Sequence, residues 1–211
     1  GLVTQVYEAG RTTAARDAVL AARADGASAS LSSILEAEQA APLAEQLLAA
    51  LESLDGMGRP LFSGLRELEV PASPQGRLWR AAELVREHRG DGHLAVMVAA
   101  GLDAVQSNVL TELWLGYGFG EYSGTRGWSP ERLEAARRSL EQRGWLDGTA
   151  VTESGRAARV ALEAATDLTQ EPLVEALGDQ IESLIRSAAD LSDAVLRYPA
   201  FPADPRKRAA G

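Results

Sequence analysis

Both histidines of the chain fall within one short segment, Glu87-His88-Arg89-Gly90-Asp91-Gly92-His93. Imidazole groups exchange protons near neutral pH and also bind metals. Two glycines in three positions are costly inside a helix, so this pattern predicts a helix break at 89–92. Across such a break the two imidazoles can converge, with one ring oriented by the aspartate. The candidate catalytic residues are therefore His88, His93 and Asp91, and the candidate ligand-binding residues beside them are Glu87 and Arg89, the latter as an anchor for an anionic group.

The same segment allows two other interpretations. A metal or haem site is one, although the spacing differs from the His-Glu-x-x-His pattern of zinc helices and a third strong ligand is not obvious. We therefore predict no metal ligands, and the cofactor is unknown. The other interpretation is structural: His88 and Arg89 cap the end of one helix and Asp91 caps the start of the next.

A second unusual segment covers residues 114–128, which hold five glycines and five of the 11 aromatic residues of the chain. A regular helix cannot tolerate this composition, so we expect an ordered loop with buried rings. The rings could form the wall of an apolar cleft, or they could plug the core. A stacking platform for nucleic acid is disfavoured, because the segment has a single arginine and a glutamate. The candidate ligand-binding residues here are Trp114, Tyr117, Phe119, Tyr122 and Arg126.

The spacing of apolar residues predicts helices along most of the chain, with a short hairpin at 145–152 that turns at Asp147-Gly148. The fold class is therefore all-α with a minimal β-hairpin wing. We expect a helical bundle over 1–115, a glycine and aromatic loop at 116–128, a winged-helix-like unit over 129–169, a closing or dimerisation helix at 170–197 and a disordered tail at 198–211. The chain begins with Gly1, so we expect the bundle to lack upstream residues.

The predicted closing helix carries apolar residues at spacings of four, three, four, three and four. Such a narrow apolar seam is typical of antiparallel or coiled-coil packing, so we expect a homodimer. The seam consists of Leu177, Ile181, Leu184, Ala188, Leu191 and Val195.

Charge and composition exclude several classes of protein. The formal net charge is −9, which weighs against a broad electrostatic footprint for nucleic acid. There are no cysteines, which excludes disulfides and a cysteine nucleophile. No stretch reaches the roughly 18–20 apolar residues of a membrane span, so we expect no membrane partner and a cytoplasmic location.

Residues 126–166 follow a recognisable order: a helix, Arg143-Gly144-Trp145-Leu146, a short hairpin, then Val151-Thr152-Glu153-Ser154-Gly155-Arg156 entering another helix. This order resembles the winged-helix part of MarR-like regulators. The resemblance implies a DNA-reading helix at 130–143, but glutamates share that helix and the wing has no basic residue. DNA binding is therefore possible but disfavoured, and its candidate residues are Arg132, Arg137, Arg138 and Arg143.

A wider resemblance covers about residues 17–191. The run Leu78-Trp79-Arg80-Ala81-Ala82-Glu83-Leu84-Val85-Arg86-Glu87-His88-Arg89-Gly90-Asp91-Gly92-His93, with Ala99-Ala100-Gly101-Leu102 and Arg126-Gly127-Trp128-Ser129, looks like an actinobacterial family of helical proteins. Its members are described only as helix-turn-helix domain proteins of unknown function. The resemblance supports a helical fold and implies no particular activity.

Three functional hypotheses follow. The first is a small-molecule-binding and possibly catalytic protein, with a pocket between the His88–His93 corner and the 114–128 loop and the winged helix used as a scaffold. The second is a ligand-responsive winged-helix transcription regulator. The third is a non-catalytic dimerisation or interaction module.

Overall fold

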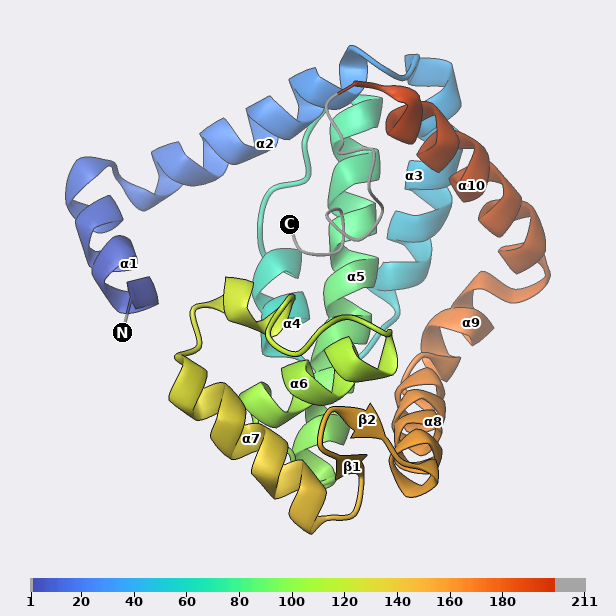
Figure 1. Cartoon of the computed structure of the whole chain (residues 1–211). Coiled ribbons are helices and arrows are strands. Elements are labelled where there is room, and N and C mark those ends of the chain that lie inside the picture. The colour runs from blue at the N-terminus through green and yellow to red at the C-terminus, as the bar shows by residue number, and fades with distance from the viewer. Residues whose placement is uncertain (1, 200–211) are drawn as a thin grey trace. The chain divides into compact units, whose positions relative to one another are not determined.

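The computed structural model describes residues 2–199, with side chains from Thr4 onward. This part of the chain is almost entirely helical, which confirms the all-α fold class (Figure 1). Its only sheet is an antiparallel hairpin that pairs Leu146 with Val151 and Asp147 with Ala150. The elements are α1 (Leu2–Thr13), α2 (Arg16–Ser32), α3 (Ala37–Glu52), α4 (Pro60–Arg66), α5 (Pro74–Ala99), α6 (Ala104–Trp114), the 3-10 helix η1 (Ser123–Arg126), α7 (Pro130–Gln142), β1 (Leu146–Asp147), β2 (Ala150–Val151), α8 (Glu153–Leu168), α9 (Glu171–Leu177), the 3-10 helix η2 (Gly178–Gln180) and α10 (Ile181–Arg197).

The chain forms two compact units, and each has its own hydrophobic core. Among the described residues, unit 1 contains 2–91 and 170–199, and unit 2 contains 92–169. The sequence pattern predicts a division at 115–116 instead. In the structure, residues 92–115 join unit 2, because α6 supplies the buried Val105, Val109 and Leu110 on which α7 packs.

The core of unit 1 is built from α3, α4 and the first part of α5, and α9 and α10 pack against it. Figure 1 shows α10 beside α3. Phe62 on α4 is fully buried, as are Ala40 and Ala44 on α3. The small alanines allow the helices to approach closely.

The single closing helix predicted over 170–197 is interrupted in the structure. Gly178 has a φ of 54°, and a 3-10 turn at this point separates α9 from α10. The predicted apolar seam largely packs within its own chain: Leu184 is buried in the core of unit 1, and Leu177, Ala188, Leu191 and Val195 are packed against that core. The seam is therefore engaged in closing unit 1.

The predicted helix break at 89–92 is wrong, because α5 continues through Gly90 and Gly92 to Ala99. Glycine costs roughly 1 kcal/mol relative to alanine in a helix, and burial on both sides of the glycines outweighs that cost. His88, Asp91 and Gly92 are all buried. In a continuous helix, residues five apart are rotated by about 140°, so the two imidazoles point to different faces of α5.

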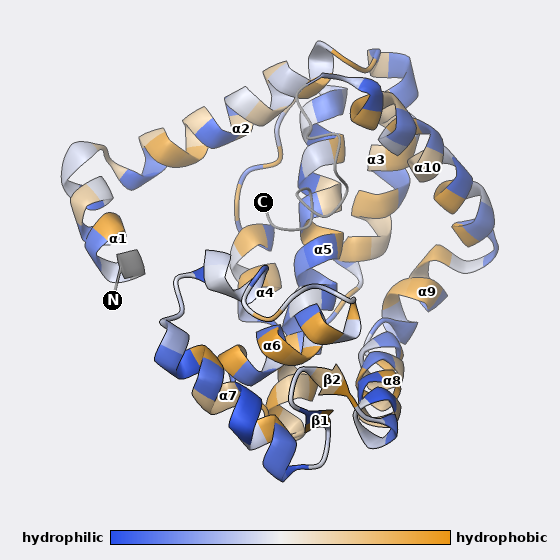
Figure 2. Ribbon diagram, in the orientation of Figure 1, coloured by the Kyte–Doolittle hydropathy of each residue, from blue (hydrophilic) through white to orange (hydrophobic). Residues whose placement is uncertain are grey.

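The core of unit 2 is built around α6 and α7, with the hairpin and α8 packed on them. Leu133, Ala136 and Leu140 form the buried face of α7, and the opposite face is strongly hydrophilic (Figure 2). The predicted tail lies outside the described residues except for Tyr198 and Pro199, which are not helical.

Candidate functional site

His88 is a buried structural side chain of unit 1. Its Nδ1 lies 2.9 Å from Gln170 Oε1, and the edge of its ring packs on Phe62 with the ring centroids 5.0 Å apart. Burial lowers the pKa of His88 below its usual value, although the hydrogen bond with Gln170 opposes the shift. The folded protein therefore favours a neutral imidazole at this position.

Asp91 and His93 have other partners. Asp91 Oδ2 accepts a hydrogen bond of 2.9 Å from the backbone N–H of Phe62, so its carboxylate satisfies a donor in the first turn of α4. His93 belongs to unit 2, where its Nδ1 lies 3.0 Å from Thr166 Oγ1. Because the Thr166 hydroxyl donates to the Leu162 carbonyl at 2.8 Å, the His93 ring is the donor in this pair. The three candidate catalytic residues thus hold different elements in place.

Glu87 and Arg89 lie on one groove of unit 1. The groove has a volume of about 470 Å³ and is also lined by Gln170 and Leu173. Arg86 forms an ion pair with Glu87. Of the residues predicted to bind a small molecule, Glu87 and Arg89 thus line one groove.

The glycine and aromatic loop of unit 2 is organised by a residue that the sequence analysis missed, Glu112. Its side chain is fully buried, and its carboxylate accepts hydrogen bonds from the backbone N–H groups of Gly120, Tyr122 and Ser123 at 2.8, 3.1 and 2.8 Å. Gly120 has a φ of 79°, a conformation that an L side chain rarely adopts. The Glu112 carboxylate therefore fixes the backbone of the loop at residues 120–123.

The sequence does contain a signal for this role. Glu112 continues the spacing of Val105 and Val109 on the core-facing stripe of α6, where a lone carboxylate would otherwise be buried without a partner. Such a residue must find donors, and the glycine-rich segment that follows supplies backbone N–H groups.

The five rings of the loop divide between the core and the surface. Phe119 and Trp128 pack against the core of unit 2, and the Trp128 indole N–H donates to Asn108 Oδ1 at 3.0 Å. Tyr117 and Tyr122 stack on each other with centroids 6.2 Å apart. The loop therefore plugs the core with part of its aromatic set.

The remaining candidates of the loop, Trp114 and Arg126, each belong to an arginine–aromatic pair. Arg126 lies over the ring of Tyr122 and donates to its hydroxyl oxygen at 2.6 Å. Trp114 lies beneath the guanidinium of Arg159, 4.8 Å from the ring centroid. Arginine and aromatic rings attract each other in this arrangement.

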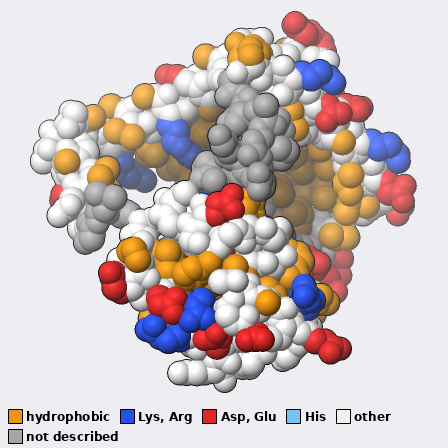
Figure 3. Space-filling model, viewed as in Figure 1, with side chains coloured by type: hydrophobic (Ala, Val, Ile, Leu, Met, Phe, Trp, Pro, Cys, Tyr) orange, Lys and Arg blue, Asp and Glu red, His pale blue; other side chains and the backbone are white. Residues whose placement is uncertain are grey.

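The helix predicted to read DNA begins as its sequence suggests. The Ser129 hydroxyl accepts a hydrogen bond from the Arg132 N–H, and Pro130 occupies the first turn. Figure 3 shows arginine and acidic side chains interleaved over α7.

Two of its four candidate arginines form ion pairs or hydrogen bonds that hold unit 2 together. Arg137 forms ion pairs with Glu134 and Glu141 at 2.7 and 2.6 Å and donates to the Gly148 carbonyl of the wing at 3.2 Å. These two carboxylates hold the pKa of Arg137 above its usual value. Arg143 donates to the carbonyls of Ala100 and Gly101 at the end of α5.

The other two arginines lie on the exposed face of α7. Arg132 stacks on Trp128 with its guanidinium 4.5 Å from the ring centroid. The side chain of Arg138 is 57% exposed and forms an ion pair with Glu134 at 3.4 Å. Exposed residues at spacings of four, three and four form a stripe on this face, which we call the α7 stripe: Glu131, Ala135, Arg138 and Gln142.

The end of the hairpin explains the Thr-x-x-Gly pattern at 152–155. The Thr152 hydroxyl accepts from the Gly155 N–H at 3.0 Å and donates to the Gly144 carbonyl at 2.6 Å. A Cβ on Gly155 would lie 2.2 Å from the Trp145 carbonyl oxygen. A side chain larger than that of glycine at position 155 would therefore clash with the segment that enters the wing.

Two further findings concern metals and membranes. Within residues 4–199, no group of three or more metal-ligating side chains comes together. No single described helix has the length and apolarity of a membrane span, although α5 and α6 pass that test as a pair bent by 104°.

Unit 2 thus has two packed helices joined by an ordered loop, followed by a two-stranded wing, an arrangement typical of helix-turn-helix proteins. Comparison with protein families agrees: residues 1–202 match the helix-turn-helix family, and the chain belongs to it. No curated protein and no solved structure matches the chain.

Proposed function

We propose that this protein binds duplex DNA through α7 of its helix-turn-helix unit. The observation that carries the proposal is the α7 stripe together with the neighbouring Arg132. In the major groove, arginine pairs with guanine, glutamine pairs with adenine and alanine contacts the thymine methyl group. Arg138, Gln142 and Ala135 offer these three chemistries on one exposed helix face.

The charge of the unit implies modest affinity. Residues 92–169 contain ten acidic residues and seven arginines, which gives a net charge of −3. Three of those arginines, Arg137, Arg143 and the buried Arg159, are held by internal partners. Few phosphate contacts remain, so base contacts must supply a large share of the specificity.

The test is fluorescence anisotropy with a random-sequence duplex at low salt, followed by selection from a random duplex library. We expect saturable binding, a recovered sequence preference, and a loss of about 10-fold on Arg138→Ala. Arg186→Ala is the matched control, because Arg186 is an exposed arginine of α10 in unit 1. Flat titrations, or equal losses for both variants, would contradict the proposal.

A homodimer is part of this proposal. One α7 reads only a few base pairs, and dimers of helix-turn-helix proteins double the contacts by using two half-sites. Light scattering after size exclusion should give twice the chain mass of 22.3 kDa, and the selected sites should be palindromic. A monomer that binds single, non-repeated sites would contradict it.

A second candidate function is small-molecule binding at the groove lined by Glu87 and Arg89. The observation that favours it is the groove itself, where an arginine, a glutamate and the amide of Gln170 lie beside apolar carbon from Leu173. Native mass spectrometry of the purified protein should show a retained molecule that is lost on Leu173→Arg, and a clean mass in both would count against it. No reaction is proposed at this groove, because His88 is buried and hydrogen-bonded to Gln170.

A further inference from the structure

Arg80 on α5 is the most deeply buried guanidinium in the described part of the chain. The residue is 3% exposed, and its Nη1 donates to Glu83 Oε2 at 2.7 Å. Its Nε finds no hydrogen-bond partner among residues 4–199. A buried N–H on a charged group is expensive to leave unpaired.

The ion-pair cluster of Arg80 contains two arginines and one carboxylate. Glu83 is shared, because its other oxygen pairs with Arg23. Arg23 and Arg80 both lie over the ring of Trp79, each guanidinium 4.9 Å from its centroid. Burial and the nearby Arg23 lower the pKa of Arg80, and Glu83 only partly opposes them. One more negative group would complete this cluster.

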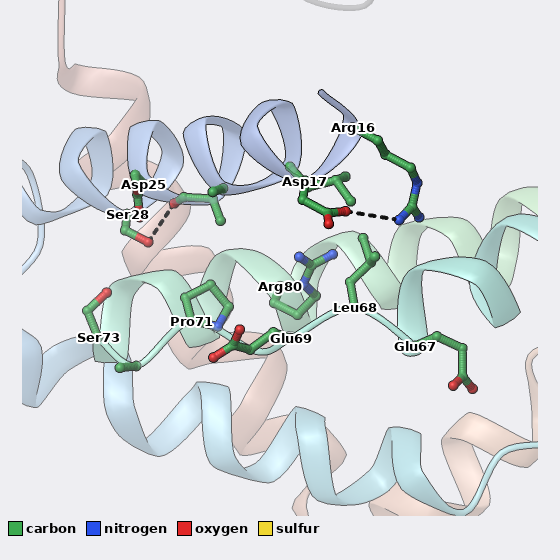
Figure 4. Close-up of a pocket in the computed structure, with 14 residues that line it drawn as sticks. Arg16, Asp17, Asp25, Ser28, Glu67, Leu68, Glu69, Pro71, Ser73 and Arg80 are labelled. Carbon is green, nitrogen blue, oxygen red and sulfur yellow. Dashed lines mark hydrogen bonds and ion pairs between the residues drawn. The ribbon is translucent and has the colours of Figure 1, made fainter. Parts of the chain in front are cut away.

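The side chain of Arg80 is one of those that line a groove in unit 1. The groove has a volume of about 610 Å³ and lies between α2, the 67–73 segment and α5. Figure 4 shows the Arg80 guanidinium pointing from α5 toward α2. The walls include apolar carbon from Leu20, Ala24 and Leu68.

We propose that this groove binds a small organic carboxylate with an apolar body, and that its carboxylate accepts hydrogen bonds from Arg80. Charge-assisted hydrogen bonds from a guanidinium to a carboxylate are among the strongest that proteins make. Four carboxylates, Asp17, Asp25, Glu67 and Glu69, line the groove beside Arg16 and Arg80. A second negative charge on the ligand is therefore disfavoured, and an added ammonium group is tolerated.

Three probes of one carbon skeleton test this chemistry by calorimetry on the full chain. They are 4-methylpentanoate, which has the carboxylate alone, L-leucine, which adds an ammonium group, and 3-methylbutylamine, which has only the amine. We expect saturable binding of at least one of the two carboxylates below about 10 mM and none of the amine. The ranking of the two carboxylates then tells whether the acidic rim selects a zwitterion.

Two sets of variants connect binding to the groove. Arg80→Met combined with Glu83→Gln removes both partners of the buried pair, so the fold is spared an unpaired carboxylate. This double variant should lose at least about 10-fold in affinity. Ala24→Leu fills the groove from its wall, whereas Ala22→Leu places the same side chain on an exposed position of α2 that does not line it.

The proposal is supported if Ala24→Leu blocks the carboxylate and Ala22→Leu leaves its affinity unchanged. It is overturned if neither carboxylate saturates, or if the amine binds as well as the acids. It is also overturned if Ala24→Leu leaves binding intact, or if sodium acetate and sodium chloride at equal concentration shift the melting temperature as much as the probes do.

Discussion

At the scale of single residues, Glu112 shows how one buried carboxylate can define a loop. Its three backbone donors come from within four consecutive residues, 120–123, so a single carboxylate satisfies all three. We predict that Glu112→Ala lowers the free energy of unfolding by about 3 kcal/mol or more, because buried N–H groups lose a charged acceptor. Urea denaturation gives the value.

The matched control is Glu121→Ala in the same loop. Glu121 is exposed, and its carboxylate accepts from the Gly118 N–H at 2.9 Å. Its removal should cost far less, because water can satisfy the donor that it leaves. Equal losses at the two positions would show that burial is not the reason for the importance of Glu112.

The second prediction at this scale concerns His88 and pH. The folded pKa lies below the unfolded one, so the unfolded chain binds the extra proton first as pH falls. The contribution of His88 is therefore fully present above the unfolded pKa of about 6.5 and is lost as pH falls toward the folded pKa. Denaturation curves at pH 7.5, 6.5 and 5.5 should show decreasing stability, with a smaller decrease in His88→Gln. An unchanged slope in the variant would assign the pH dependence to other groups.

The sequence predicted which side chains can do chemistry but not which partners they have. His88 and Asp91 were singled out for catalysis, yet their partners, Gln170 and Phe62, come from distant parts of the chain. Glu112 was overlooked, because a pattern of residue types does not show which carboxylate is buried. Helix capping depends on local residue types, and the Ser129 and Thr152 side chains do cap α7 and α8.

At the scale of elements, the continuous α5 is the main departure from the sequence-based prediction. Glycine propensity is a local term of roughly 1 kcal/mol, whereas the buried residues around Gly90 contact helices that lie far away in the sequence. A local pattern cannot weigh such tertiary contacts. The same limit explains why the closing helix was predicted as one piece, although Gly178 divides it.

The third prediction uses one substitution at two glycines with opposite results. Gly90→Ala should raise stability by about 0.5–1 kcal/mol, because the site is helical and an added Cβ would lie 3.4 Å from its nearest neighbour, a flexible Glu87 side-chain oxygen. Gly155→Ala should lower it by about 2 kcal/mol or more, because its Cβ would clash with the Trp145 backbone. Thermal unfolding of both variants checks the signs. A loss of stability in Gly90→Ala would show that the Glu87 side chain cannot move away from the added Cβ.

At the scale of the whole molecule, the proposed DNA binding would have to work with few positive contacts, because the chain is acidic. The net charge of −9 opposes approach to DNA at long range, and this opposition weakens as salt screens it. Contacts with phosphates work the other way, because added salt weakens them by reducing the gain from counterion release. The measured salt dependence of binding therefore reports how many arginines contact DNA phosphates.

The fourth prediction is the size of that dependence. Arg126, Arg132 and Arg138 are the exposed arginines on α7 and on the loop that precedes it. Arg138 is assigned to a base, so Arg126 and Arg132 remain for phosphates. At roughly −0.9 per neutralised phosphate, these two give a slope of log K against log salt of about −2 for one unit and about −4 for a dimer. Anisotropy titrations between 50 and 200 mM salt measure it, and Arg132→Ala should make the slope less steep by about one per chain. A slope near zero would leave α7 without phosphate contacts, and a slope far steeper than −4 would require basic residues outside this face.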